Sequence, residues 1–292
     1  MNTKQTCDLF SFNGEPKDQT YIDVRDLDIK PYPTVRQKCK ALWEHFIPLA
    51  DTKFISQFAN HFSGGYWEML LAQTLREQDF MLASEDDGPD IRTTINDRTV
   101  YFEAICPTSG DGDNEVLGLP ASDYVQALKQ NPITLRLTSA FVNKCRAFQK
   151  YLDKGVVAQD DILVIAINGS SIPDIRIENR ECPEIVKIAY GIGSYEISKN
   201  LHTGKVTGCY LERNFVVSPK GSQIPTNLFL DLSNRHISAV LYTYQDAFNS
   251  GGYYLVHNPN ATNPLPMGYI KGLTEFSYMA TGESGIFQFV RT

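Results

Sequence analysis

Two hydrophobic periodicities divide this chain of 292 residues into a helix-rich first half and a strand-rich second half. In the first half, apolar residues recur at intervals of three and four, which predicts helices over residues 34–46, 67–78 and 137–152. Thr34 is the expected N-cap of the first helix. In the second half, β-branched and aromatic runs predict strands in the segments DILVIAING, EIVKIAYGI, VTGCYLERNFVV, HISAVLYTY, GGYYLVHN and GIFQFV.

The same pattern predicts one domain preceded by a short extension. Residues 1–33 are polar and end in the prolines of PYPT, which predicts a loose N-terminal arm. Residues 34–292 contain no repeat, low-complexity tract or linker, so they are expected to form a single domain. A strand in DFMLAS and a short helix over 123–129 complete the prediction. The mixture of elements predicts an α/β fold with a mixed central sheet flanked by helices.

The segment GPDIRTTINDRTVYFEAICP, residues 88–107, has the pattern of a β-hairpin. If residues 96–97 form a two-residue turn, Ile95 faces Arg98, and the same register places Asp90 opposite Glu103. Alternation supports this register, because the apolar residues then share one face of the hairpin and the two carboxylates share the other. The residues of the apolar face are Ile91, Ile95, Val100 and Phe102.

Two carboxylates directly opposite each other repel, so an opposite charge or a raised pKa is needed to stabilise them. A divalent cation is one such partner, since Mg²⁺ binds to one or two carboxylates together with water and phosphate oxygens. The alternative is that Asp90 and Glu103 lie at exposed strand ends and are simply solvated.

Composition excludes several classes of protein. The six cysteines form no CxxC pair and have no nearby histidine, which predicts reduced thiols in a cytoplasmic protein. The first ten residues lack a signal-peptide pattern, and no apolar run is long enough for a membrane helix, so no membrane partner is expected. The net charge of −7 does not indicate a general nucleic-acid binder.

The charge is unevenly distributed along the chain. Residues 77–115 carry 11 acidic side chains against two arginines, whereas residues 129–154 carry six basic side chains against one aspartate. An acidic patch beside a basic helix suits a metal site next to a track of phosphates. The alternative is that both are ordinary solvated faces.

Lys144 is placed in the middle of the apolar stripe of the helix predicted over 137–152. An ammonium group on an apolar face is costly unless it reaches solvent or has an anionic partner. Two alternatives follow. Either the side chain extends to solvent, or the helix covers the sheet and Lys144 points at Asp90 and Glu103.

The segments GPDI and VYFEAICP resemble the core of the PD-(D/E)XK nuclease superfamily, and RLTSAFVNK, LVIAIN, HISAVLYTY and HNPNATNPLP resemble a group of bacterial proteins assigned to it. The resemblance implies a restriction-endonuclease-like core with additional C-terminal strands. It implies that Asp90 and Glu103 bind Mg²⁺ or Mn²⁺, together with the backbone carbonyl of Ala104. The family has a lysine two residues after the glutamate, where this chain has Ile105. In some members that lysine has moved to a neighbouring helix, which would be Lys144 here.

Four further residues are candidates for the site. Many members of the superfamily supply a carboxylate from the helix before the sheet, where Glu68 stands; the alternative is a surface glutamate. Arg136, Thr138 and Ser139 are predicted at the start of a helix, where a guanidinium, hydroxyls and free backbone N–H groups bind phosphate. Ordinary N-capping by Thr138 or Ser139 is the alternative.

Together these features predict a metal-dependent nuclease that hydrolyses phosphodiester bonds, with DNA favoured over RNA, and the resemblance also implies a possible homodimer. The alternative is a catalytically inactive protein of the same fold that acts as a nucleic-acid-binding or regulatory module. An enzyme acting on a small phosphorylated substrate has no supporting motif, since the chain has no Walker loop, no GxGxxG after a strand and no HExxH.

Overall fold

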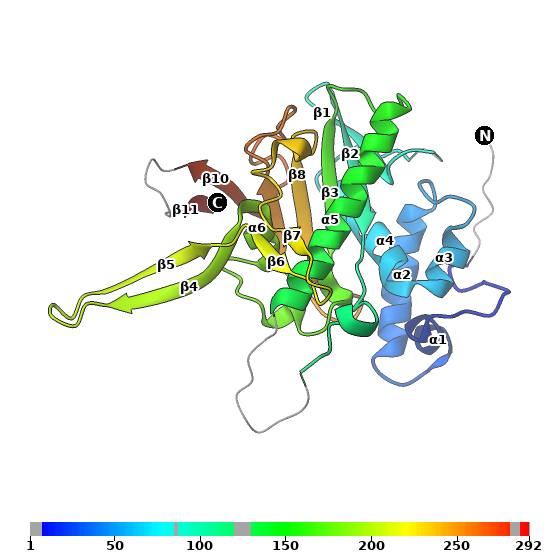
Figure 1. Cartoon of the computed structure of the whole chain (residues 1–292). Helices are drawn as coiled ribbons and strands as arrows, with labels where there is room; N and C mark the ends of the chain where they lie inside the picture. Colours follow the sequence, from blue (N-terminus) through cyan, green and yellow to red (C-terminus); the bar gives the residue numbers. More distant parts are fainter. Residues whose placement is uncertain (1–7, 85–86, 120–129, 281–286, 292) are drawn as a thin grey trace.

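The computed structural model describes residues 8–84, 87–119, 130–280 and 287–291. Its centre is a mixed sheet of seven strands in the order β1-β2-β3-β8-β9-β10-β11 (Figure 1). The β2–β3, β3–β8 and β9–β10 pairs are parallel, and the other neighbours are antiparallel. The strands are β1 (Ile91–Ile95), β2 (Arg98–Ile105), β3 (Ile162–Asn168), β8 (Ala239–Thr243), β9 (Tyr253–His257), β10 (Thr274–Ala280) and β11 (Phe287–Arg291).

Helices flank this sheet, so the predicted α/β class is confirmed. Alternate residues of β3 enter two separate hydrophobic cores, Val164 and Ala166 in one and Leu163 and Ile165 in the other. The first core contains residues of the four N-terminal helices, and the second contains residues of the two later helices. The helices are α1 (Gln19–Asp26), α2 (Tyr32–Phe46), α3 (Phe54–Asn60), α4 (Phe62–Arg76), α5 (Gln130–Asp153) and α6 (Glu184–Tyr190).

Residues 8–33 belong to the body of the protein, so the predicted loose arm is wrong for these residues. They contain α1, whose Tyr21 and Val24 are fully buried, and Leu9 is buried in the same core. The side chain of Asp18 caps α1 by accepting a hydrogen bond from the backbone N–H of Tyr21 at 3.1 Å. The apolar stripe expected for α2 is buried, but the helix starts at Tyr32 and Thr34 is not its cap.

The predicted β1–β2 hairpin is confirmed in its turn and its register. Asn96 and Asp97 have φ angles of 48° and 60°, as both central residues of a type I′ turn require. Ile95 pairs with Arg98, and the ladder continues outward to the pair of Ile91 and Phe102. All four residues of the predicted apolar face are buried in the core on the side of the N-terminal helices.

Several predicted elements differ from the structure. The segment EIVKIAYGI contains α6 instead of a strand, because this helix is buried on every side and its sequence shows no polar face. DFMLAS contributes only an isolated bridge between Ala83 and Arg92. Helix α4 begins five residues before the predicted start and includes Gly65, where an added Cβ would lie 2.8 Å from Phe58. The helix predicted over 123–129 lies outside the described residues.

Two pairs of strands lie outside the central sheet. Strands β4 (Ile192–Lys199) and β5 (Val206–Glu212) form a long hairpin that projects from the body (Figure 1), and β6 (Phe215–Val217) pairs with β7 (Gln223–Pro225). Within the described part of the chain, every helix is either too short or not apolar enough to cross a membrane.

A buried network of charged side chains joins α6 to the strands beside it. Glu184 accepts hydrogen bonds from Thr134 and from Arg213, the latter at 2.6 Å, and its other oxygen lies 3.3 Å from the Lys187 ammonium. Glu178 accepts hydrogen bonds from the backbone N–H of Glu184 and from the Tyr242 hydroxyl. Burial raises the pKa of the Glu178 carboxyl group to about 7 despite these two donors.

Glu178→Gln should change how the stability of the protein depends on pH. The folded protein binds the Glu178 proton with a pKa of about 7, above the ordinary value of 4.5. The unfolded chain therefore releases this proton first as the pH rises, and the wild type loses stability between about pH 4.5 and 7. Glutamine does not titrate, so the variant should gain roughly 3 kcal/mol relative to the wild type as the pH rises through this window.

Urea unfolding at a series of pH values measures this difference. Glu44→Gln, on the exposed surface of α2, is the matched control for the loss of one carboxyl group. A difference between wild type and Glu178→Gln that stays constant from pH 4.5 to 8 would contradict the prediction.

Candidate active site

A cavity of about 450 Å³ lies between the N-terminal helices and the edge of the sheet formed by β1 and β2. Three carboxylates line it: Asp51 from the loop before α3, Glu68 from α4, and Asp90 immediately before β1. Ala104 and Ile105, at the C-terminal end of β2, form part of its wall. Other polar lining residues are Gln57, His61, Ser84 and Cys106.

Asp90 is held against β2 by a hydrogen bond. Its Oδ2 accepts from the backbone N–H of Ala104 at 2.6 Å, so the carboxylate lies over the residue that follows Glu103. Burial raises the pKa of Asp90, although the Lys144 ammonium and the Ala104 N–H act in the opposite direction. The first of the two predicted carboxylates therefore lies in a cavity rather than at a solvated strand end.

Glu103 is buried, with 4% of its surface exposed, and it faces α5. The Lys144 ammonium donates a hydrogen bond to its Oε1 at 2.8 Å, so the contact expected between the helix and the hairpin is present. The other oxygen, Oε2, is buried without a hydrogen-bond partner among the described residues. Burial, followed by repulsion from Asp90, raises the pKa of Glu103 to about 7.

Lys144 remains positively charged in this environment. Burial lowers its pKa, but the carboxylates of Glu103 and Asp90 raise it by more, so the result is a pKa above the ordinary value. Lys144 is thus an ion-pair partner rather than a lysine that extends freely to solvent.

Glu68 is fixed by the packing of α4 on the sheet. The indole N–H of the adjacent Trp67, which is fully buried, donates to the backbone carbonyl of Ala166 on β3 at 3.0 Å. This contact anchors the helix above the strand and leaves Glu68 facing the cavity. Burial, followed by repulsion from Asp90, raises the pKa of Glu68 to about 8.

The predicted residues divide between the two faces of β2. Glu68, Asp90 and Ala104 line the cavity, whereas Glu103 and Lys144 lie on the α5 side of the strand. The two groups nevertheless interact, because the charges of Asp90 and Lys144 affect the pKa of Glu103. The charges of Asp90, Lys144 and Glu103 also act on Glu68, so these side chains form one electrostatic cluster.

The predicted phosphate site at the start of a helix is wrong. Helix α5 begins at Gln130, so Arg136, Thr138 and Ser139 lie within it and their backbone N–H groups are not free. Thr138 is 1% exposed and faces the core, and it does not serve as an N-cap. The Arg136 guanidinium hydrogen-bonds the carbonyl of Thr108 at 2.9 Å and also its hydroxyl.

Arg136 is still positioned near the site. Thr108 lies three residues after the last residue of β2, so this contact places the guanidinium near the C-terminal end of the strand that carries Glu103. Arg136 and Lys144 are eight residues apart on α5, a spacing that puts both on one face of the helix and about 12 Å apart along its axis.

Asp51 was not predicted from the sequence. It lies near the mouth of the cavity, and its negative charge contributes to the raised pKa values of Glu68 and Asp90. Its Oδ1 accepts from the backbone N–H of Lys53 at 2.9 Å, an interaction typical of any turn aspartate. No sequence signal therefore distinguishes it from an ordinary loop residue.

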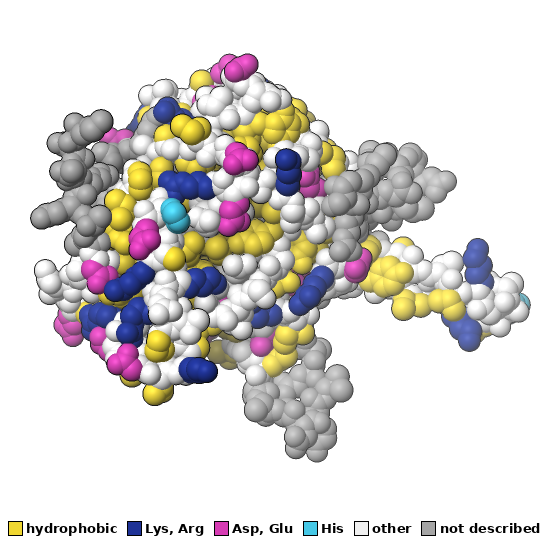
Figure 2. All heavy atoms as spheres, turned by 180° about the vertical axis from the view of Figure 1, so that it is seen from behind, with side chains coloured by type: hydrophobic (Ala, Val, Ile, Leu, Met, Phe, Trp, Pro, Cys, Tyr) yellow, Lys and Arg dark blue, Asp and Glu magenta, His cyan; other side chains and the backbone are white. Residues whose placement is uncertain are grey.

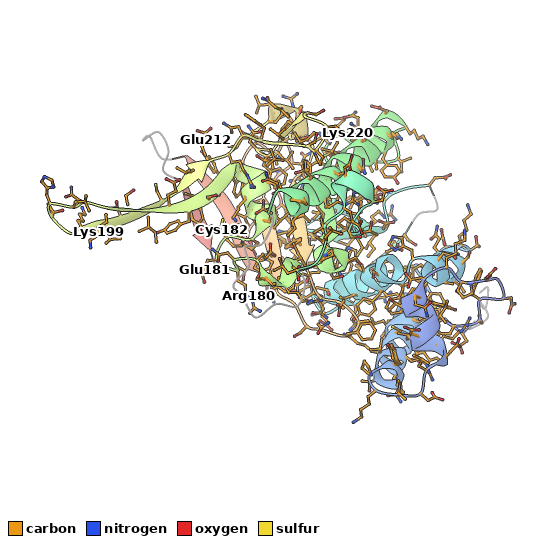
Figure 3. The ribbon with its side chains drawn as sticks, turned by 60° about the horizontal axis from the view of Figure 1, so that its bottom comes forward. Arg180, Glu181, Cys182, Lys199, Glu212 and Lys220 are labelled. Carbon is orange, nitrogen blue, oxygen red and sulfur yellow. The ribbon has the colours of Figure 1, made fainter. Side chains whose placement is uncertain are left out.

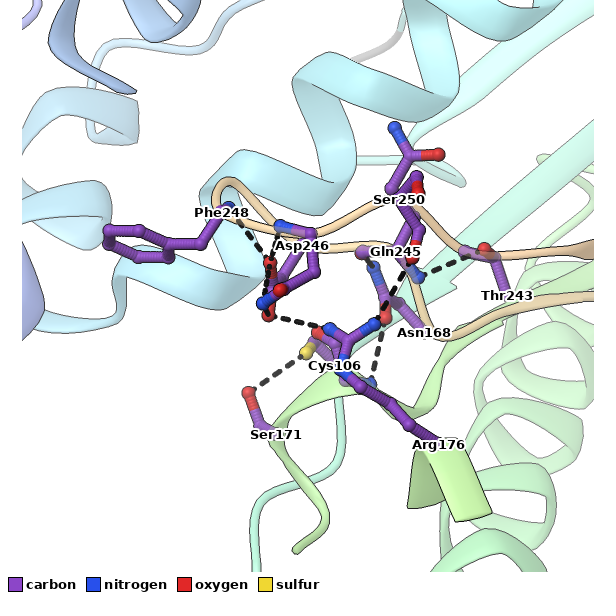
Figure 4. Close-up of polar contacts among 11 residues, drawn as sticks. Cys106, Asn168, Ser171, Arg176, Thr243, Gln245, Asp246, Phe248 and Ser250 are labelled. Atoms are coloured by element: carbon purple, nitrogen blue, oxygen red, sulfur yellow. Dashed lines mark hydrogen bonds and ion pairs between the residues drawn. The ribbon is translucent and has the colours of Figure 1, made fainter. Parts of the chain in front are cut away.

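A network of polar contacts holds the loops at the C-terminal ends of the central strands (Figure 4). Asp246 pairs with Arg176 at 2.6 Å, and the Asn168 side chain donates to the carbonyl of Gln245 at 2.8 Å. Cys106, which lines the cavity, contacts the Ser171 hydroxyl at 3.5 Å. Cys106 thereby connects one wall of the cavity to the loop that carries Ser171.

The residues present fit a hard divalent cation. Among the described residues, no three His, Cys, Asp or Glu side chains converge as a ready-made metal site. Mg²⁺ needs fewer, because it binds to one or two carboxylates and keeps several waters. The cluster offers oxygen ligands, raised carboxyl pKa values and a buried Glu103 Oε2 that has no hydrogen-bond partner within the described residues. Each of these features favours the binding of added positive charge.

The pairing of Lys144 and Glu103 should be measurable as a coupling energy. Lys144→Met leaves Glu103 buried without its cation, and Glu103→Gln leaves the ammonium without its anion, so each single variant should lose stability. The double variant should be less destabilised than the sum of the two, with a coupling of roughly 1–3 kcal/mol. Urea unfolding of all four proteins at pH 8 measures this coupling.

The pair of Lys40 and Asp8 is the control for this double-mutant cycle, because its side chains are 46% and 54% exposed. The same cycle with Lys40→Met and Asp8→Asn should give less than about 1 kcal/mol. Equal coupling energies in the two cycles would show that the contact of Lys144 with Glu103 behaves as an ordinary surface pair.

Comparison of the chain with protein-family models, with curated proteins and with solved structures found no match. The interpretation of the cavity therefore depends on its own geometry and on the resemblance of the hairpin segment described above.

Proposed function

We propose that this protein is a metal-dependent nuclease that hydrolyses phosphodiester bonds in DNA. The observation that carries the proposal is the environment of Glu103. One of its oxygens is held by the Lys144 ammonium, the other is buried without a hydrogen-bond partner in the part of the chain that the structure describes, and Asp90 lies at the end of the neighbouring strand. A buried carboxylate with one unpaired oxygen is costly unless a further positive charge contacts it.

The metal would be held by Glu68, Asp90 and Glu103, with the backbone carbonyl of Ala104 as a fourth oxygen ligand. When bound, Mg²⁺ or Mn²⁺ polarises a phosphate and lowers the pKa of a coordinated water. The resemblance to the PD-(D/E)XK superfamily supports this set, because Asp90 and Glu103 occupy the positions of its two conserved acidic residues.

Lys144 would replace the lysine that the superfamily has at the position of Ile105. As an ammonium paired with Glu103, it supplies positive charge next to the site of reaction and stabilises negative charge that develops on the phosphate. The hydrogen bond also fixes the rotamer of Glu103 and thereby the direction of its second oxygen.

Arg136 would bind the DNA backbone beside the scissile phosphate. Its hydrogen bonds to Thr108 orient the guanidinium, which is suited to phosphate by its planar array of donors. Thr138 has no part in this contact because it is buried in the core. Ser139 is exposed, and nothing in its surroundings assigns it a role.

Asp90→Asn and Glu103→Gln should each abolish metal-dependent cleavage of DNA. Removing a partner of a metal ligand costs about 10–100-fold in affinity or activity, so a ligand should cost at least about 100-fold. Incubation of purified protein with plasmid and linear DNA, in Mg²⁺ or Mn²⁺ and with EDTA as the blank, measures the activity. Calorimetric titration with Mn²⁺ measures the binding that both variants should lose.

Glu44→Gln, on the surface of α2, should retain both cleavage and Mn²⁺ binding. Lys144→Met should lose cleavage, because it removes a charge that acts on the substrate and the hydrogen bond that orients Glu103. Cleavage by wild type that Glu103→Gln leaves intact would overturn the proposal. Nucleic-acid binding without any cleavage would favour the alternative of an inactive protein with this fold.

A further inference from the structure

The hairpin of β4 and β5, here called the arm, is the most exposed feature of the described chain. Every residue from Ser194 to Cys209 is exposed, and the arm extends away from the body in the views of Figures 1 and 3. Figure 3 labels Lys199 on its distal part and Glu212 at its base. A segment so exposed contributes little to the core, so its sequence is free to serve contacts with another molecule.

The base of the arm is firmly attached. Ile192 is fully buried, the backbone N–H of Arg213 donates to the carbonyl of Gly191 at 2.7 Å, and the Arg213 side chain pairs with Glu184 at 2.6 Å. Both strands of the arm therefore start from the buried network around α6. The arm leaves the body in a fixed direction.

The arm is also stiffened along its length. The rings of Tyr195 and Tyr210 contact each other with centroids 5.0 Å apart. Tyr195 lies across Gly208 on the opposite strand, where an added Cβ would meet its hydroxyl at 2.0 Å. These contacts hold the two strands together as an ordered β-ribbon.

The distal part of the arm combines apolar and cationic side chains. Leu201 at the tip is 88% exposed, and Ile197 and Val206 on one face are 71% and 59% exposed. Residues 197–211 contain Lys199, Lys205 and one histidine but no acidic residue, in a chain whose net charge is −7. Figure 2 shows hydrophobic side chains along the arm and Lys or Arg side chains near its end.

The two lysines of the arm have no anionic partner among the described residues. Neither Lys199 nor Lys205 takes part in an ion pair, whereas the lysines at positions 40, 144 and 187 each do. The two ammonium groups lie on the distal part of the arm, beyond Glu196 on β4 and Glu212 at its base, and there they are complementary to a polyanion.

We propose that the arm is a DNA-binding ribbon that enters a groove of duplex DNA, with Lys199 and Lys205 contacting phosphates and Leu201 contacting the bases. Grooves of B-form DNA admit a two-stranded β-ribbon, and apolar side chains at the end of such elements insert between base steps. The deep, narrow major groove of A-form RNA does not admit a ribbon, which favours DNA over RNA.

A second copy of the chain is a poorer match for this surface. Protein interfaces are depleted in lysine at their cores, and here the lysines lie in the same segment as the exposed apolar residues. Exposed apolar side chains beside unpaired cations are instead typical of proteins that contact DNA through a groove.

The role of the arm rests on the proposed nuclease function, because the arm would hold a second region of the same DNA. It concerns binding and not cleavage, so the two are separable. The acidic cavity alone repels DNA phosphates, and a cationic contact elsewhere on the molecule would compensate for that repulsion.

Fluorescence anisotropy with a labelled DNA duplex of about 30 base pairs tests the arm. The buffer contains EDTA, so that no cleavage occurs, and the salt concentration is varied from about 50 to 200 mM. Lys199→Ala/Lys205→Ala should weaken binding and reduce the slope of log K against log salt by about 2, because each phosphate contact contributes about 0.9. Lys17→Ala/Lys30→Ala, which removes two exposed lysines at the N-terminal side of the molecule, should bind as the wild type does.

Leu201→Ser separately tests the proposed contact of Leu201 with the bases. It should weaken binding several-fold with no change in the salt slope, because it removes no charge, and it should reduce bending of a doubly labelled duplex measured by energy transfer. Circular dichroism establishes that the arm variants fold, as expected for changes confined to exposed residues.

The outcomes distinguish the two proposals. Arm variants that bind DNA like the wild type, or a wild type that does not bind DNA, would overturn the arm proposal whatever the cleavage assay shows. Equal loss of binding to an RNA duplex would contradict the choice of DNA. If light scattering shows that the wild type is a dimer and the arm variants are monomers, the arm belongs to a contact between copies. DNA binding that depends on the arm, without metal-dependent cleavage, would support the arm and reject the nuclease.

Discussion

The ion pair between Lys144 on α5 and Glu103 on β2 is the interaction on which the candidate site depends. Without it, Glu103 would be a buried carboxylate close to Asp90, and both would be driven toward their protonated forms. The ammonium reaches Glu103 because α5 packs its apolar face on the sheet, with Leu137, Phe141 and Phe148 all buried. The charge balance of the site is therefore a consequence of tertiary packing.

The remaining carboxylates form no ion pair with any described residue. Glu68 and Asp90 face the cavity, and Asp51 adds further negative charge at its mouth. Their positions are fixed independently, Glu68 by the anchoring of α4 and Asp90 by its hydrogen bond to Ala104. A cavity whose walls hold like charges at fixed positions attracts a cation, because the walls cannot move apart to relieve the repulsion.

The sequence predicted the hairpin best, because turn geometry and strand alternation constrain the same register. Asn96 and Asp97 tolerate positive φ, and one shift of register would have exposed every apolar residue of β1. The contact of Lys144 with Glu103 was one of two alternatives that the sequence left open, because a charge within an apolar stripe either reaches solvent or pairs with an opposite charge.

Other features could not be predicted because their causes are tertiary. Helix α6 is buried on all sides, and its two charged residues are neutralised inside the core, so it shows no amphipathic period. Helix α5 begins at Gln130 rather than at residue 137, and Pro132 lies in its first turn, where proline is tolerated. That error misplaced Arg136 at a helix start, and only the contact with Thr108 shows that it still lies beside the end of β2.

The isoleucine at position 105 is consistent with a cation delivered by the helix. Ile105 lines the cavity and also packs against the core on the α5 side. A lysine there would bring a second ammonium close to Glu103, where Lys144 already occupies one oxygen, and like charges in a partly buried site repel strongly. An apolar residue avoids this repulsion and seals the boundary between the cavity and the core. Moving the charge from strand to helix makes it depend on the docking of α5, so any change that loosens this helix would alter the site without touching its carboxylates.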